Sequence, residues 1–215
     1  MPKRHYLKLF KELNKSRLLR LQAAVLFLTT YIDWVIMPFV AKLEGTHLPV
    51  FAISLYMLFG ASDGFVQPLF KKVKIYNIYL FVIILDLIQI ISYLISHYNI
   101  VMFTYAILSI FTLQAITFEI SRVHTIDFMK DEIEIKEYLM LRSFIVSSAI
   151  IMGACTAMIL DYFDVTLQIT LSILAILGFF AIIIEYKLYA KFHNIVQEEV
   201  IIERDRKLLN EKISL

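Results

Sequence analysis

The stretch FVIILDLIQIISYL, residues 81–94, decides the fold, because it is almost entirely apolar. It also contains one aspartate, Asp86, with no basic residue beside it. The apolar run around it covers residues 77–96 and is long enough to cross a hydrocarbon layer of about 30 Å as a helix. An ionised Asp86 at the centre of such a helix costs roughly 2.5–3.5 kcal/mol. The fold depends on which solvent surrounds this helix, and the function depends on what its carboxyl group does.

The composition of the chain identifies the solvent. Of the 215 residues, 60% are hydrophobic and 19% are charged, whereas soluble domains have about 45–50% apolar and 25% charged residues. The charges are also bunched, so that Asp86 and Glu119 are the only ionised groups between residues 81 and 121. We therefore predict an all-α, polytopic membrane protein.

Six apolar segments are long enough to form membrane-spanning helices. They lie at about 21–41, 49–70, 77–96, 100–120, 139–160 and 166–186. The predicted organisation is a basic amphipathic segment at 1–20, a six-helix domain at 21–190 whose two three-helix groups are joined by a loop at 121–138, and a charged tail at 191–215.

The lysines and arginines predict the orientation of these helices. They are concentrated in the N-terminal segment, after the second and fourth spans and in the tail, whereas the other three connections contain a single Lys. The positive-inside rule places both termini in the cytoplasm, and an even number of crossings agrees. We expect a multi-pass protein of the cell (inner) membrane whose basic N-terminus contacts anionic lipid rather than nucleic acid. The tail is interpreted as a solvated helical extension, a helix on the membrane surface or an arm that binds a protein partner.

Aspartates on three consecutive spans form the candidate site. They are Asp33, Asp63 and Asp86, and no Lys or Arg lies deep within any span. Helical spacing places Tyr79, Gln89 and Tyr93 on the face of Asp86, and Trp34 follows Asp33 directly. One interpretation is a cavity that binds a proton, a sodium ion or an organic cation. The other is that neutral aspartates donate interhelical hydrogen bonds and contribute packing specificity only.

The fifth span contains small residues at four-residue intervals, Ala149, Gly153 and Ala157. Small residues in this pattern let two helix backbones approach closely. Within one bundle this is ordinary packing, whereas on an outward face it is a subunit interface, and both alternatives stay open on the sequence.

Several segments together resemble the N-terminal half of a major facilitator superfamily transporter of the drug- and macrolide-exporter type. The segments are TTYIDWVIMPFVAKLEGTHLPVF (29–51), KKVK (71–74), IILDLIQ (83–89), ITFEISRVHTIDFMKDE (116–132) and EYLMLRSFIVSSAIIMGA (137–154). The likeness covers about residues 20–190. Gln114 stands in span four, where proton-driven exporters often carry an Arg, and the second six-helix half is missing.

The resemblance implies a half-size transporter that exports a cationic or amphipathic small molecule in exchange for protons or cations. Two copies, or one copy and a second half-transporter chain, would complete a twelve-span unit, with Ala149, Gly153 and Ala157 packing between them. The residues that would line the cytoplasmic gate are Lys71, Lys72, Lys74, Glu119, Arg122 and Arg142.

A different class of function is the alternative. The chain could be a non-transporting immunity, assembly or regulatory partner built on a half-transporter scaffold, acting through its charged tail. We do not expect an enzyme, a cofactor or a metal site, because the five histidines are scattered over termini and loops and form no ligand cluster or catalytic triad.

Overall fold

The computed structural model describes residues 11, 13, 16–41, 73–96, 106, 110, 113 and 133–213. The helices in these ranges are α2 (Arg17–Ala41), α5 (Ile75–Ile95), α7 (Ile135–Tyr162) and α8 (Leu167–Ile213). All four are long and apolar enough to cross a membrane, and the described residues contain no strand. For the described residues, this confirms the predicted all-helical class and gives four candidate membrane spans. The predicted spans 49–70 and 100–120 lie outside the described residues.

Local signals explain where the helices begin. The hydroxyl of Ser16 accepts a hydrogen bond from the backbone N–H of Leu19 (3.4 Å), and that of Thr166 accepts one from Ile169 (3.4 Å), so each residue satisfies an N–H group left open at a helix start. The first span therefore begins four residues earlier than predicted. α7 begins at Ile135, so it includes the last residues of the loop predicted at 121–138.

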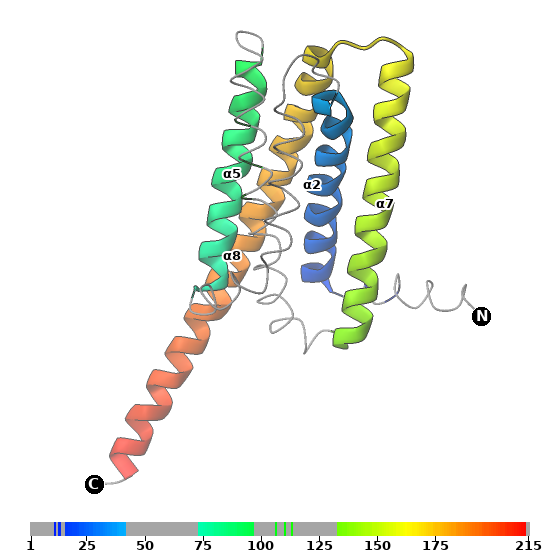
Figure 1. Cartoon of the computed structure of the whole chain (residues 1–215). Coiled ribbons are helices and arrows are strands. Elements are labelled where there is room, and N and C mark those ends of the chain that lie inside the picture. Colours follow the sequence, from blue (N-terminus) through cyan, green and yellow to red (C-terminus); the bar gives the residue numbers. More distant parts are fainter. Residues whose placement is uncertain are drawn as a thin grey trace, which may run out of the picture.

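The turn between α7 and α8 is short and sharply bent. Asp164 adopts a left-handed conformation with φ of 51°, and the N–H of Val165 donates to the carbonyl of Leu160 (2.9 Å). Asp is one of the few residues that adopt this conformation at low cost. The turn sends α8 back in the direction opposite to α7 (Figure 1).

The helices pack in the order α5, α8, α2, α7, because α8 contacts both α5 and α2, and α2 also contacts α7 (Figure 1). α2, α5 and α7 run in one direction and α8 runs in the other (Figure 1). Basic residues gather at the end of the bundle where α2, α5 and α7 begin, which we call the basic end. They are Arg17, Arg20, Lys74, Lys136, Lys187 and Lys191.

Polar groups face inward and apolar groups face outward on α5. Tyr79, Asp86, Gln89, Tyr93 and Ser96 are all buried. The opposite face exposes large apolar side chains, Leu80, Phe81, Ile84, Leu87, Ile88, Ile91 and Leu94. A helix in water has the reverse arrangement, so this distribution indicates that the outer face of α5 contacts lipid.

Two hydrophobic clusters hold the bundle together. The basic-end cluster consists of Leu18, Leu19, Ile75, Tyr79, Ile133, Tyr138, Leu188 and Phe192. The far cluster consists of Ile32, Val35, Ile36, Tyr93, Leu171 and Leu174. Since both clusters draw on α2, α5 and α8, the segments of these helices between them lie in a separate middle layer.

The last helix continues far beyond the bundle. α8 has 47 residues, about 70 Å at 1.5 Å per residue, and its apolar part ends at Glu198. The charged tail predicted at 191–215 therefore continues α8 without a break up to Ile213, pointing away from the other helices (Figure 1).

Candidate functional site

Three carboxyl groups from three helices interact in the middle layer and at its border with the far cluster. Asp86 of α5 is 5% exposed and Glu185 of α8 is 0% exposed, while Asp33 of α2 is half-buried. The carboxyl group of Asp86 interacts electrostatically with that of Asp33 and with that of Glu185. We call Asp33, Asp86 and Glu185 the carboxyl layer.

The two hydrophobic clusters set the depth of each carboxyl group. Glu185 lies one helical turn from Leu188 of the basic-end cluster, and Asp33 directly follows Ile32 of the far cluster. Asp86 lies about 16 Å along α5 from Ile75, near the centre of the span. The carboxyl layer is therefore staggered along the bundle, with Asp86 between the other two.

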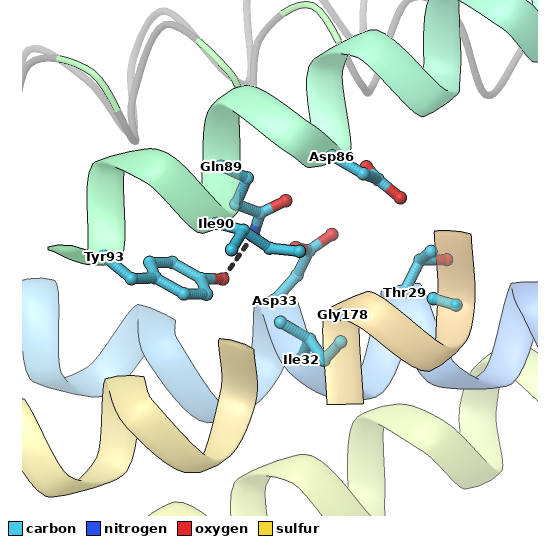
Figure 2. Close-up of a pocket in the computed structure, with 9 residues that line it drawn as sticks. Thr29, Ile32, Asp33, Asp86, Gln89, Ile90, Tyr93 and Gly178 are labelled. Atoms are coloured by element: carbon cyan, nitrogen blue, oxygen red, sulfur yellow. Dashed lines mark hydrogen bonds between the residues drawn. The ribbon is translucent and has the colours of Figure 1, made fainter. Parts of the chain in front are cut away.

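A small cavity opens on this layer (Figure 2). Its described lining residues are Thr29, Ile32, Asp33, Asp86, Gln89, Ile90, Tyr93, Gly178 and Ala181. It has about 10 Å³ of space for the centre of a water molecule, which is room for roughly one water. The carboxyl group of Asp33 reaches from α2 toward α5 and lies between the side chains of Gln89 and Asp86 (Figure 2).

Gln89 connects the carboxyl layer to the far cluster. Its amide nitrogen donates a hydrogen bond to the hydroxyl of Tyr93 (2.6 Å), and its side chain also hydrogen-bonds to Asp33. One amide NH₂ group has two N–H donors, enough for both partners. Ser92, one turn along, donates to the backbone carbonyl of Gln89 (2.7 Å). The two side-chain bonds hold the Gln89 amide between Tyr93 on the same helix and Asp33 on α2.

The described helix segments that carry the three acids provide no basic residue at their level. α2 after Arg20, the whole of α5 and α8 before Lys187 contain no Lys or Arg. Neither carboxyl oxygen of Glu185 makes a hydrogen bond of normal geometry within the described part of the chain, although both are buried. Buried polar groups are normally hydrogen-bonded, and the described acid that interacts with Glu185 is Asp86.

The structure brings together only part of the predicted site. Asp33, Asp86, Gln89 and Tyr93 line the cavity. Tyr79 instead belongs to the basic-end cluster, where its ring stacks on that of Phe192 (5.1 Å between centroids). Its hydroxyl accepts a hydrogen bond from Gln22 (3.2 Å).

Trp34 does not line the cavity. Its side chain is 41% exposed, and its backbone and Cβ face Gly153 on α7. Consecutive residues of a helix point about 100° apart, so a side chain next to Asp33 turns away from the face that Asp33 occupies.

The residues predicted for a gate are mostly outside the described ranges. Lys74 is exposed at the start of α5, with its ammonium group 5.7 Å from the ring centroid of Tyr76. Arg142 is half-buried two turns inside α7. The predicted residues that the structure does not describe are Asp63, Lys71, Lys72, Gln114, Glu119 and Arg122.

The small-residue stripe of α7 packs within the chain. Ala149 and Ala157 are buried, and a Cβ placed on Gly153 would lie 2.9 Å from both the Cβ of Trp34 and the carbonyl oxygen of Tyr31. The hydroxyl of Tyr31 also donates to Thr156 (3.0 Å). The stripe thus serves as the contact with α2, and it is not open to a second copy of the chain.

Glu185 is the site residue that sequence reasoning missed. It lies near the end of the predicted span 166–186, where an acid next to Lys187 is typical of a helix leaving the membrane. The spacing of Ala181, Glu185, Leu188 and Phe192, at offsets of four, three and four, was the available signal, since all four are buried on one face of α8.

No described group of three His, Cys, Asp or Glu side chains is gathered closely enough to hold a metal ion. The chain matches no protein-family model, no curated protein and no solved structure among those compared with it.

Proposed function

We propose that this chain is a membrane transporter subunit whose carboxyl layer is the site of proton or cation coupling. The observation that carries the proposal is a chain of three interacting acids from three helices, in which Asp33 and Asp86 line one cavity and Glu185 interacts with Asp86. The described segments of α2, α5 and α8 that carry these acids contain no Lys or Arg between Arg20 and Lys187. Ionisable groups inside a membrane bundle are costly, and proteins retain them mainly on ion and proton pathways.

The size of the cavity favours a coupling ion over a cargo molecule at this position. Sites for drug-sized ligands have volumes of about 300–1,000 Å³, whereas the space here accepts roughly one water molecule. In the proposal the carboxyl layer binds the ion, and a cationic or amphipathic cargo binds in another conformation of the bundle, which opens toward one side at a time.

The directions of the helices support the predicted six spans. α2, α5 and α7 all begin at the basic end (Figure 1). In this proposal each of the two connections between them crosses the membrane once, which gives the six predicted spans. The positive-inside rule then places the basic end and both termini in the cytoplasm. The proposed location of the protein is the cell (inner) membrane.

A transporter of this size fits the resemblance to half of a major facilitator superfamily exporter. Two such units related by an axis along the membrane normal would insert in the same orientation. We propose a homodimer, or a complex with a second half-size chain, as the working form. Because Ala149, Gly153 and Ala157 contact α2, the interface in this proposal uses another face of the bundle.

A transport assay in vesicles tests the proposal. The purified chain is reconstituted into liposomes, a pH gradient is imposed, and the fluorescent organic cation ethidium serves as the probe. We expect gradient-driven ethidium movement that Asp86→Asn reduces at least tenfold. The matched control is Asp164→Asn, an exposed acid outside the carboxyl layer whose left-handed backbone Asn adopts easily. Equal ethidium movement by both variants would contradict the proposal.

The extension of α8 favours a second candidate function, that of a non-transporting partner protein. About 15 residues of continuous helix extend beyond Glu198, and their sequence is densely charged. If the biological activity of the chain is lost on deleting residues 199–215 but survives Asp86→Asn, this second function is the correct one.

A further inference from the structure

Glu185 is the most deeply buried acid among the described residues. We propose that Asp86 and Glu185 share a single proton and, with Asp33, form a three-group proton path, so that the coupling ion is H⁺ and not a metal cation. This inference rests on the proposed function and names the ion that its site binds.

The pairing of the two acids requires a proton between them. Two ionised carboxylates side by side repel each other, and the repulsion is strong where water is excluded. With one proton present, the protonated acid donates a short, charge-assisted hydrogen bond to the ionised one. This arrangement gives Glu185, whose two oxygens have no other hydrogen-bond partner in the described ranges, a partner in Asp86.

The described helices around the pair contribute one further acid and no basic group that faces it. From α2 the facing titratable group is Asp33, which interacts with Asp86. On α5 itself the titratable group that interacts with both aspartates is Tyr93, whose hydroxyl accepts a hydrogen bond from Gln89. The charged residues of α7 are Lys136, Glu137 and Arg142 near its start and Asp161 in its last turn, and α7 packs on α2. The described segments that carry the three acids contain no basic residue at their level, so the positive partner in this proposal is a proton.

The stagger of the three acids defines a route for the proton along the bundle. Asp33 lies at the cavity and Glu185 lies on the side of the basic end, with Asp86 interacting with both. A proton that moves from Glu185 to Asp86 breaks one O–H bond and forms another, and the total charge of the pair stays the same. Asp86 then passes the proton to an ionised Asp33, and Glu185 takes up a new proton from the basic side.

A metal cation fits this site less well than a proton. Hard cations such as Ca²⁺ and Mg²⁺ require about six or more oxygen ligands. The cavity holds roughly one water, and the described acids are not gathered closely enough to bind a metal ion. Asp33 also has the Gln89 amide beside it, which offers N–H donors toward an ionised carboxylate.

Labelling with dicyclohexylcarbodiimide, a hydrophobic reagent that reacts with protonated carboxyl groups, tests the shared proton directly. The detergent-solubilised chain is labelled over a range of pH values, and each modified residue is located by mass spectrometry. We expect at most one label per chain on residues 86 and 185 together, falling about tenfold per pH unit on the alkaline side and unchanged by sodium ions. Asp164, exposed to water, serves as the unlabelled internal control.

Two variants make the outcome decisive. Glu185→Gln should shift the pH at which Asp86 is labelled, because the proton has lost one of its two sites, and Asp86→Asn should do the same for Glu185. The inference is overturned by two labels on one chain, by no label at either residue at any pH, by an unshifted pH profile in both variants, or by protection with sodium. A circular dichroism spectrum unchanged from wild type establishes that each variant is folded.

The labelling needs no transport, so the two proposals fail separately. Loss of ethidium movement with pH-dependent labelling intact refutes the transporter and leaves the shared proton. Protection by sodium with ethidium movement intact refutes the proton as coupling ion and leaves the transporter.

Discussion

The backbone of Gly153 on α7 lies so close to Trp34 on α2 that a Cβ atom at residue 153 would be 2.9 Å from the Cβ of Trp34. Real Cβ atoms do not approach this closely, and the obstructing atoms include the rigid backbone oxygen of Tyr31. Gly153 therefore sets the distance between α2 and α7, and through α2 it supports the helix that carries Asp33.

This contact predicts that Gly153→Ala destabilises the bundle. The added methyl group forces the helices apart at a cost of about 1–3 kcal/mol, which exceeds the gain of up to about 1 kcal/mol from the higher helix propensity of Ala. The matched control is Gly178→Ala, whose Cβ would meet only the flexible side chain of Ile90 at 3.3 Å. Thermal unfolding in detergent, followed by circular dichroism, should show a lower midpoint for Gly153→Ala than for Gly178→Ala; the reverse order would contradict the prediction.

The hydrogen bond between Tyr31 and Thr156 predicts a measurable coupling between α2 and α7. The hydroxyl groups are 3.0 Å apart, and Thr156 in turn donates to the carbonyl of Met152 (2.8 Å). Interhelical hydrogen bonds in membrane proteins contribute on average about 0.6 kcal/mol. A double-mutant cycle with Tyr31→Phe and Thr156→Val should give a coupling of this size. Strictly additive effects would mean that the bond contributes nothing to stability.

The shared proton predicts how stability depends on pH. If the folded pair holds one proton that the unfolded chain releases, folding takes up a proton, and stability falls as the pH rises above the ordinary carboxyl range. The slope is about 1.4 kcal/mol per pH unit for one proton, and it ends once the folded chain also releases it. Glu185→Gln should shift the pH range over which this slope is seen, because the proton has lost one of its two sites, whereas Asp164→Asn should leave the range unchanged. The same pH range in wild type and Glu185→Gln would count against the shared proton.

Removing the end of α8 should leave the bundle intact. The residues of α8 in the two hydrophobic clusters, and those packed against them, extend no further than Val196. Deleting residues 199–215 should therefore keep the thermal midpoint within a few degrees of that of the full chain. A large drop would show that the extension stabilises the spans and is more than an appendage.

The helices that the sequence located well are those with long uninterrupted apolar runs. The third span was predicted at 77–96 and is observed at Ile75–Ile95, because the period and length of an apolar run are properties of the sequence itself. The start of α2 was missed, since it depends on Ser16 accepting a hydrogen bond from Leu19. From the sequence alone, a polar residue followed by Arg17 and Arg20 is typical of a solvent-exposed segment before a span.

The candidate site was only partly predictable for a geometric reason. Asp86, Gln89 and Tyr93 share a face of one helix, which spacing alone establishes. Glu185 and Lys187 are two residues apart and therefore point in nearly opposite directions around α8, one buried and one exposed. Hydropathy averaged along the chain does not distinguish the two residues and shows only a polar end of the span. The packing of α8 on α5 is needed to show that the acid is buried and the lysine is exposed.

The small-residue stripe shows a second limit of sequence reasoning. Ala149, Gly153 and Ala157 predict a close helix contact, but the pattern is the same for a contact within the chain and for a contact between chains. The partner helix is set by tertiary packing, here through Trp34 and Tyr31 of α2.

Coupled fluxes provide the most direct measurement of the central claim, that the carboxyl layer links proton movement to cargo movement. Liposomes containing the chain are loaded with a pH-sensitive dye, and ethidium is added on one side while both signals are recorded. We predict proton movement opposite to ethidium movement in the wild type and in Asp164→Asn, and neither movement in Asp33→Asn or Asp86→Asn. Undiminished, coupled fluxes in Asp33→Asn and Asp86→Asn would contradict the account.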